Sequence, residues 1–275
     1  MIPEPPKERP RAMAMNAHPR LLVDERRQKI LDLVEKQGRV TVNEMVKRFG
    51  VSAVTVRGDL DSLYRSGAVI RSHGGALKRV GALQDIPIDV KETLHHGEKV
   101  RIGHAAAQMI RENETVMLDS GTTTAEVSRH IKFLKLKSLT VITNALNIAM
   151  ELANLSHVRV IMIGGILRHM SYSLVGPHAE QTLRGLNADR LFLGVDGLDP
   201  GIGLSTPDVL EAQLNASMIR VSREVVVVAD SSKFERRSLS VIAPLDQVHK
   251  VITDDRVSPE MVAALKAHNV EVVIA

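Results

Sequence analysis

Seven short runs of apolar, mostly β-branched residues recur through the larger C-terminal part of the 275-residue chain, and they limit the possible fold more than any other feature. Most of the runs lack polar alternation, as strands buried on both faces do, and stretches with helical spacing separate most of them. This alternation predicts an α/β domain with a largely parallel sheet. The runs cover residues 115–118, 140–143, 158–163, 191–195, 225–229, 250–253 and 271–274.

The preceding segment, residues 24–79, predicts a winged helix-turn-helix. Apolar residues at helical spacing follow an expected N-cap at Asp24, and a second helix is expected over residues 42–49. Ser52 offers the hydroxyl N-cap of a third helix after a tight turn. Residues 68–77 then predict two short strands around a Gly-Gly turn, which form the wing.

The third helix of this segment is the expected DNA-reading element. Segment 24–79 has twelve basic and seven acidic side chains, a net of +5, whereas the whole chain has a net charge of only +4. In the third helix, Val56, Leu60 and Leu63 form the buried stripe, so the first turn of this helix is free to contact bases and phosphates in a major groove. A winged helix used for protein contacts is the alternative. The expected DNA contacts are Ser52, Ala53, Thr55 and Arg57 in the helix and Arg71 and His73 in the wing.

Small, hydroxyl-bearing and charged residues follow the apolar runs of the larger domain. Ligands of parallel sheets bind at the carboxyl ends of the strands, so these residues predict a site for a phosphorylated polyol. The stretch 119–124 leads into a helix, and glycine, hydroxyls and free amides at a helix N-terminus suit a phosphate. Lys233 and Arg168 are candidate partners for its charge. The expected ligand-binding residues are Asp119, Ser120, Gly121, Thr122, Thr123, Thr124, Asn144, Gly165, Arg168, Asp196, Ser205, Glu211 and Lys233.

Motifs in both segments resemble the DeoR family of bacterial sugar-metabolism repressors. In the first segment the motifs are Arg26-x3-Ile30-x3-Val34, Ser52-x2-Thr55-Val56-Arg57-x-Asp59-Leu60 and Arg71-Ser72-His73-Gly74-Gly75-Ala76. In the second they are DSGTTT (119–124), TNALN (143–147), LGVDG (193–197), GLSTP (203–207) and ADSSKF (229–234). Within the family, the wording is most similar to repressors of N-acetylgalactosamine and galactosamine catabolism. The resemblance implies a sensor domain with the fold of ribose-5-phosphate isomerase and glucosamine-6-phosphate deaminase.

One residue departs from the family pattern. Gly58 stands in the third helix, where the family often has a polar or basic residue. Glycine inside a helix costs about 1 kcal/mol relative to alanine, and it removes one possible contact to DNA.

These patterns divide the chain into four parts. Residues 1–23 are expected to be a disordered tail, 24–79 the winged helix-turn-helix, 80–97 a linker and 98–275 the sensor domain. The linker is either a relay between the domains or a passive tether. His95 and His96 within it are expected to be exposed to solvent rather than bound to a metal.

Composition excludes several other classes of protein. The chain has no cysteine, which rules out disulfides, a thiol nucleophile and thiolate metal sites and fits a cytoplasmic location. It has no run of about 18 uncharged apolar residues, so no membrane span is expected. We expect no cofactor, no metal and no catalytic residues.

The expected function is transcriptional regulation. The resemblance implies a repressor of a carbohydrate catabolic operon, and of an amino-sugar operon within that class, which leaves double-stranded operator DNA when a phosphorylated sugar binds. We expect a homo-oligomer, either a dimer or a tetramer, because paired recognition helices read paired half-sites.

A sugar-phosphate isomerase is the alternative. Asp196 and Asp199 resemble the paired carboxylates of ribose-5-phosphate isomerase, and Glu211 could serve as the base that an enediol mechanism needs. However, the Lys-Gly-Gly-Gly-Gly loop of that enzyme is absent from the sequence.

Overall fold

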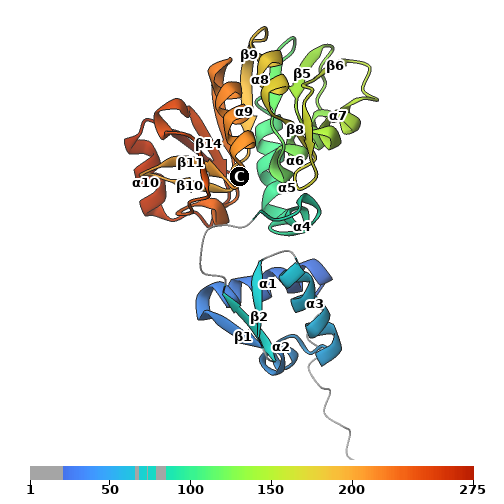
Figure 1. Ribbon diagram of the computed structural model, residues 1–275, viewed down its shortest axis with the longest axis vertical. Helices are drawn as coiled ribbons and strands as arrows, with labels where there is room; N and C mark the ends of the chain where they lie inside the picture. Colours follow the sequence, from blue (N-terminus) through green and yellow to red (C-terminus); the bar gives the residue numbers. More distant parts are fainter. Residues whose placement is uncertain (1–20, 66–67, 73, 79–84) are drawn as a thin grey trace, which may run out of the picture.

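The computed structural model describes residues 21–65, 68–72, 74–78 and 85–275. Figure 1 shows a small winged helix and a larger α/β domain, with helix α4 (Ile88–Thr93) on the side of the larger domain that faces the winged helix. The predicted fold class is confirmed. Among the described residues, no helix is both long and apolar enough to cross a membrane.

The small domain is a three-helix winged fold, as the sequence predicted. Its three strands form an antiparallel sheet in the order β1-β3-β2. Of the expected DNA contacts, His73 lies outside the described part of the chain, and so do residues 1–20 of the expected tail. The elements are α1 (Val23–Gln37), β1 (Arg39–Thr41), α2 (Val42–Phe49), α3 (Ala53–Arg65), β2 (Val69–Ser72) and β3 (Gly75–Lys78).

Helix α3 packs as its apolar period predicted. Val56 and Leu60 are fully buried and Leu63 is nearly so, within one core shared by all three helices and the sheet. At its start, the Ser52 hydroxyl accepts a hydrogen bond from the Thr55 N–H at 3.1 Å, which makes Ser52 the N-cap as expected. A buried carboxylate, that of Asp59, ties α3 to the Arg26 guanidinium of α1.

The start of α1 differs from the prediction. The helix begins at Val23 with Leu22 as its N-cap, so Asp24 lies in the first turn and is not the cap. The Leu22 N–H donates to the Glu25 carboxylate at 3.0 Å, so the third residue of the helix binds back to the N-cap backbone as in a capping box, although Leu22 has no capping side chain. Both acidic side chains then lie at the helix N-terminus, where the helix dipole favours negative charge.

The larger domain is built on a seven-stranded sheet whose described neighbours all pair in parallel. All seven predicted runs are strands of this sheet, in the order β15-β14-β12-β9-β4-β5-β6. The strands are β4 (Thr115–Leu118), β5 (Leu139–Thr143), β6 (Val158–Met162), β9 (Ala188–Leu193), β12 (Ser222–Val228), β14 (Lys250–Thr253) and β15 (Glu271–Ile274).

Helices cover both faces of this sheet, which explains the absence of polar alternation in the strands. One core joins one face of the sheet to α8 (Pro177–Leu183), α9 (Val209–Arg220) and α10 (Pro259–Ala267). The second core joins the other face to α5 (His96–Ala107), α6 (Thr122–Ile131) and α7 (Leu146–Leu152).

Five short strands were not predicted. They form two small antiparallel sheets beside the main one and contain only three or four residues each, too few to show a period. They are β7 (Ile166–Arg168) with β8 (Ser173–Val175), and β10 (Gly197–Asp199), β11 (Gly203–Thr206) and β13 (Ser240–Ala243).

The order of the strands reverses between β4 and β9. From β4 the chain moves outward to β5 and β6, then returns to place β9 on the other side of β4 and continues to β15. Such a switch point leaves a crevice at the carboxyl ends of the two central strands. The loops after β4 and β9 therefore meet at this crevice.

The opposite end of the sheet is held by a buried ion cluster. Arg190 of β9 pairs with Glu114, just before β4, at 2.9 Å and with Glu224 of β12 at 2.8 Å. Its guanidinium also donates to the Met109 carbonyl at 2.6 Å. One side chain thus joins the amino ends of three neighbouring strands.

Gly58 provides a test of local stability in α3. It is exposed in mid-helix, and a Cβ added there would meet nothing within 4 Å. Gly58→Ala should therefore stabilise the helix by about 0.5–1 kcal/mol. In hydrogen–deuterium exchange on the full-length protein, the α3 amides should exchange about two- to fivefold more slowly.

Gly75→Ala is the matched control. A Cβ at Gly75 would lie 2.1 Å from the Val40 carbonyl oxygen, across the β1–β3 pair, so this change should speed exchange in the wing. Equal effects of the two substitutions would contradict this packing.

Candidate functional site

A polar pocket lies at the switch point of the main sheet. The loops after β4 and β9 supply its floor, and side chains from α4, α9 and the short helix η1 (Ser231–Lys233) surround it. The lining residues are Ile88, Lys91, Asp119, Ser120, Gly121, Thr122, Thr123, Met170, Ser171, Gly194, Val195, Asp196, Thr206, Glu211, Asn215 and Lys233.

Asp196 is the electrostatic centre of the pocket. One carboxylate oxygen lies 2.8 Å from the Lys91 Nζ and 3.5 Å from the Lys233 Nζ. Burial alone would raise the pKa of the Asp196 carboxyl, but the two ammonium groups outweigh burial and hold that pKa well below its usual range. Asp196 is therefore ionised, with a cation on either side.

The same contacts act on Lys91. Burial has the largest single effect and lowers the pKa of its ammonium group, but the charge and hydrogen bond of Asp196, together with the nearby Glu211 and Asp85 carboxyls, outweigh burial and raise that pKa above its usual value. Lys91 is thus a half-buried, charged lysine whose partner comes from a segment more than one hundred residues away along the chain. An anion entering the pocket would meet both lysines.

Two further carboxyl groups, those of Asp119 and Glu211, line the pocket. Burial raises the pKa of Asp119 to about 8, although the Gly194 N–H donates to this carboxyl at 3.0 Å. Burial also raises the pKa of Glu211 to about 7, against the opposing effect of Arg168. The Ser120 hydroxyl donates to Glu211 at 3.2 Å. These two carboxyls can therefore take up protons near neutral pH.

The start of α6 borders the pocket. Gly121 is the N-cap, and no side chain in the described part of the chain caps this end, so its first amides face outward. Thr122 and Thr123 line the pocket, whereas the Thr124 hydroxyl donates to the carbonyls of Asp119 and Gly121. Thr124 therefore shapes the loop rather than facing the ligand space.

Four other expected residues lie behind the lining. The Asn144 amide donates to the Leu174 carbonyl at 3.3 Å, and the Ser205 hydroxyl donates to the Gly197 carbonyl at 3.3 Å. Gly165 has φ +145° and packs against Val175.

Arg168 is the fourth. Its guanidinium is already shared among Asp85, Asp208 at 3.2 Å and Glu211 at 3.2 Å. It therefore does not line the pocket itself and reaches it through Glu211 and through the Ser171 hydroxyl, to which it donates at 2.7 Å. Of the two cations expected to meet phosphate, Lys233 lines the pocket directly.

Several lining residues were not identified from the sequence. Lys91 is the most important, and it lies on α4 within the stretch expected to be a linker. Because α4 precedes β4, the first strand of the main sheet along the chain, inspection of the residues after each strand could not identify Lys91. Thr206 adjoins Ser205 in the same strand, and the alternation of side chains turns one toward the pocket and the other inward. Asn215 leaves its Oδ1 without a hydrogen-bond partner among the described residues.

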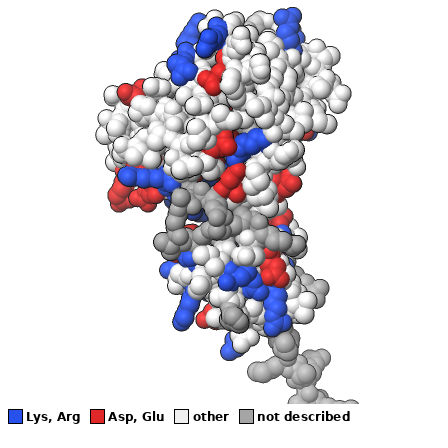
Figure 2. Space-filling view, in the orientation of Figure 1, with Lys and Arg blue, Asp and Glu red and all other residues white. Residues whose placement is uncertain are grey.

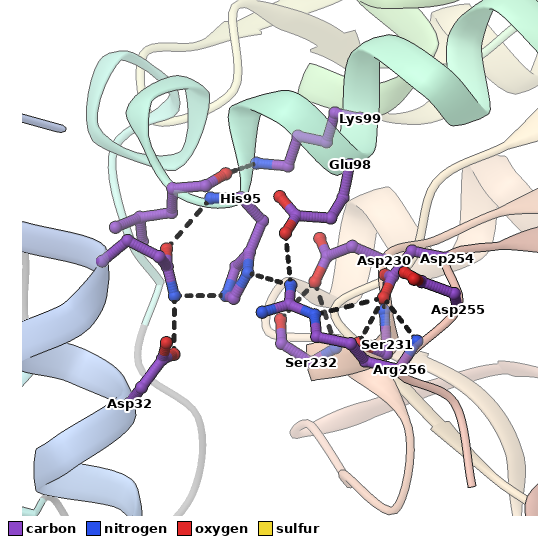
Figure 3. A network of polar contacts seen from close by, with 12 residues as sticks. Asp32, His95, Glu98, Lys99, Asp230, Ser231, Ser232, Asp254, Asp255 and Arg256 are labelled. Carbon is purple, nitrogen blue, oxygen red and sulfur yellow. Dashed lines mark hydrogen bonds and ion pairs between the residues drawn. The ribbon is translucent and has the colours of Figure 1, made fainter. Parts of the chain in front are cut away.

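The linker histidines also differ from expectation. His96 is exposed, as predicted, but His95 is half-buried between Gln28 of α1 and Arg256 of the loop after β14. Figure 3 shows His95 at the centre of this polar network. The sequence showed two adjacent histidines but not the residues that surround them.

The winged helix presents its basic residues to solvent. Arg57 is exposed near the start of α3, and Figure 2 shows Lys and Arg side chains over this part of the molecule. Thr55 shares a hydroxyl contact of 2.8 Å with Ser52. Arg71 pairs with Asp61 at 2.9 Å and donates to the Gly75 carbonyl, so it also braces the wing.

Comparison with known proteins covers nearly all of the chain. The DeoR-like helix-turn-helix domain matches residues 26–78, and the DeoR C terminal sensor domain matches residues 94–255. A solved ribose 5-phosphate isomerase A from Neisseria gonorrhoeae aligns with a TM-score of 0.35 and 15% identity over 50% of this chain and 53% of that one. This likeness is too low to support an argument.

Curated relatives extend over almost the full length. A protein of Escherichia coli O157:H7, whose name assigns it to repression of the aga operon, is 37% identical over 91% of this chain and 93% of its own. The transcriptional repressor AccR of Agrobacterium fabrum is 36% identical over 84% and 89%. The glycerol-3-phosphate regulon repressor of Escherichia coli K12 is 30% identical over 88% and 95%. The chain belongs to the DeoR family of transcriptional regulators.

Proposed function

We propose that this protein represses a carbohydrate catabolic operon, specifically one for amino-sugar use, and leaves its operator when a phosphorylated sugar binds the pocket. The observation that carries the proposal is the ionised Asp196 between Lys91 and Lys233, at the switch point of a sheet in the same chain as a winged helix. The amino-sugar assignment is supported by the relative named for the aga operon.

The pocket chemistry supports a phosphoryl group as the anionic part of the ligand. Two lysines and the uncapped start of α6 offer charge and amide donors, the combination that binds phosphates. The carboxyl groups of Asp119 and Glu211 offer hydrogen-bond partners to sugar hydroxyls. A relative named for glycerol 3-phosphate agrees with a phosphorylated polyol.

The DNA contacts fall to the first turn of α3 and to the wing. In this proposal Arg57 pairs with guanine or a phosphate, and Thr55 contacts a phosphate or a thymine methyl group. Ser52, Ala53, Arg71 and His73 complete the surface. A dimer or tetramer would place two such helices on half-sites separated by whole turns of DNA.

The ligand must distinguish two arrangements of the winged helices. A tenfold loss of operator affinity requires the sugar to favour the released arrangement by about 1.4 kcal/mol. A single charge-assisted hydrogen bond, worth about 1.5–3 kcal/mol, is enough if it forms in one arrangement only.

The isomerase alternative is not favoured. The relatives that match the full chain are named as transcriptional regulators. In addition, the sequence lacks the Lys-Gly-Gly-Gly-Gly loop of ribose-5-phosphate isomerase.

Arg57→Ala tests the DNA surface. Removing a charged contact to a base or phosphate should weaken binding by about tenfold or more, without changing sugar binding. Binding would be measured by fluorescence anisotropy on double-stranded DNA selected from a random library with the wild-type protein. Arg223→Ala, at an 84% exposed arginine of the larger domain, is the control and should have no effect. Unchanged DNA binding in Arg57→Ala would refute the assignment of α3.

Lys233→Ala tests the pocket. Loss of one cation should weaken sugar-phosphate binding by about tenfold or more. Thermal shift against galactosamine 6-phosphate and ribose 5-phosphate measures this loss, since a ligand of the folded state raises the melting temperature. Lys137→Ala removes an exposed lysine of the same domain and should leave the shift unchanged. A wild-type shift in Lys233→Ala would place the site elsewhere.

The raised pKa values predict a pH dependence. An anion beside Asp119 and Glu211 favours their protonated forms, so binding takes up protons and weakens as pH rises through about 7 and about 8. The ligand phosphate is already mostly dianionic there, since its second pKa is about 6. Calorimetric titration from about pH 6.5 to 8.5 should show that the affinity for the sugar phosphate falls as pH rises. Asp119→Asn should reduce the slope of the logarithm of this affinity against pH. An equal slope in both proteins would count against these carboxyls.

A further inference from the structure

His95 lies where the winged helix meets the larger domain, and it contacts both. Its backbone N–H donates to the Gln28 Oε1 of α1 at 3.1 Å, and its ring Nε2 lies 3.3 Å from the Gln28 Nε2. Its other ring nitrogen, Nδ1, lies 3.0 Å from an Arg256 guanidinium nitrogen. Figure 3 shows the ring between Asp32 of α1 on one side and Arg256 on the other.

Both neighbours of the ring are hydrogen-bond donors. Arginine has no acceptor. The Gln28 amide is oriented with its oxygen on the His95 N–H and its nitrogen on the Asp32 carboxylate at 3.0 Å, so its NH2 group faces the ring. Burial lowers the pKa of His95, which favours the neutral imidazole. A neutral imidazole has one acceptor nitrogen, so only one of the two contacts can be a hydrogen bond at any time.

One chain of contacts links this ring to the pocket through α4. Lys91 holds Asp196 in the pocket, and the carbonyl of Lys91 accepts from the Lys99 ammonium group of α5. Lys99 also donates to the Leu94 carbonyl at 2.6 Å. Leu94 directly precedes His95, and its side chain packs against the winged-helix core.

A second chain reaches the same ring through η1. Lys233 contacts Asp196 from the last residue of η1, and Ser231 at its start donates through both N–H and hydroxyl to Asp254, at 2.6 and 2.9 Å. Asp254 accepts from the backbone N–H of Arg256 at 3.1 Å. Both series of contacts begin at the Asp196 carboxylate in the pocket, and both end at His95.

We propose that His95 is the switch residue between the two domains, and that its single acceptor nitrogen is held either by Arg256 or by Gln28. The role of this switch in operator release rests on the proposed function. An anion that draws Lys233 away from Asp196 shifts η1 and moves Arg256 off the ring. The proton then leaves Nε2 for solvent, Nδ1 takes one up, and Nε2 accepts from Gln28, which fixes α1 against the larger domain. The winged helix is then held away from the arrangement that fits the operator.

The tautomer of His95 tests this without any ligand. In the full-length protein labelled with ¹⁵N-histidine, the nitrogen chemical shifts distinguish the two tautomers, and loss of signals in His95→Ala identifies those of His95. Gln28→Ala should shift the ratio toward the Nε2–H form, and Arg256→Leu toward the Nδ1–H form. Each shift should be about threefold or more, the effect of one hydrogen bond. An equal ratio in all three proteins would overturn the proposal.

Arg101→Leu is the matched control. Arg101 pairs with Asp255 at 3.2 Å, next to Arg256 in sequence, but does not contact His95. It should leave the ratio unchanged, and a shift as large as that of Arg256→Leu would mean that the loop, and not the donor on the ring, sets the tautomer. If Arg256→Leu does not fold, Gln28→Ala alone tests the proposal, because only a shift of its tautomer ratio toward the Nε2–H form supports it.

The distance between the domains gives a second readout. Because the chain has no cysteine, Lys47→Cys in α2 and Lys266→Cys in α10 would be the only two sites for spin labels. Electron–electron resonance should show a broader distance distribution in Gln28→Ala and a narrower one in Arg256→Leu, and the narrowing should be absent in a His95→Ala background. Persistence of the narrowing without the His95 ring would overturn the proposal.

Galactosamine 6-phosphate separates the switch from the proposed function. If it lowers DNA affinity and shifts the tautomer as Arg256→Leu does, both are supported. If it lowers DNA affinity and leaves the tautomer unchanged, the switch fails while the proposed function stands. If the tautomer follows Gln28 and Arg256 but no sugar phosphate alters DNA affinity, the proposed function fails and the two-donor contact at His95 stands.

Discussion

The ion cluster of Lys91, Asp196 and Lys233 is the interaction on which the rest of the structure depends. A buried charge without a partner is costly, so each member fixes the other two in place. The three residues come from α4, from the loop after β9 and from η1, which are far apart in the sequence. One half-buried carboxylate thus contacts both α4, on the side of the larger domain that faces the winged helix, and η1.

A ligand anion changes this balance more than a neutral ligand could. The lysines hold Asp196 strongly because partial burial reduces the screening by water among the three groups. A phosphoryl group offers them a second negative partner at the same place, so the attraction is divided rather than lost. The segments that carry the lysines can therefore adopt a new position at a small net cost in free energy, which is what a two-state protein needs.

Much of this architecture could be predicted from the sequence. The seven strands were identified because burial on both faces leaves apolar runs, and the buried stripe of α3 because its period is helical. The order of the strands could not be predicted, since pairing of β4 with β9 is a long-range event with no local signal. Lys91 was missed for the same reason, since 105 residues separate it from Asp196 in the sequence.

The expected site residues show the same limit. Asp119, Gly121 and Lys233 lie within the loops that follow strands, and the geometry of a parallel sheet brings such loops together. Arg168 follows the same rule in sequence, but three carboxylates already surround its guanidinium. A sequence shows that a cation is present near a strand end, but not which anions within the protein have already neutralised it.

The ion cluster around Arg190 has a consequence for how such regulators diversify. It joins β4, β9 and β12 at the end of the sheet opposite the pocket, and it shares no residue with the pocket lining. Substitutions that change which sugar is recognised can therefore accumulate in the loops at one end without loosening the strands at the other. The residues that stabilise the sheet and the residues that select the ligand lie at opposite ends of it, so one fold can serve regulators of many nutrients.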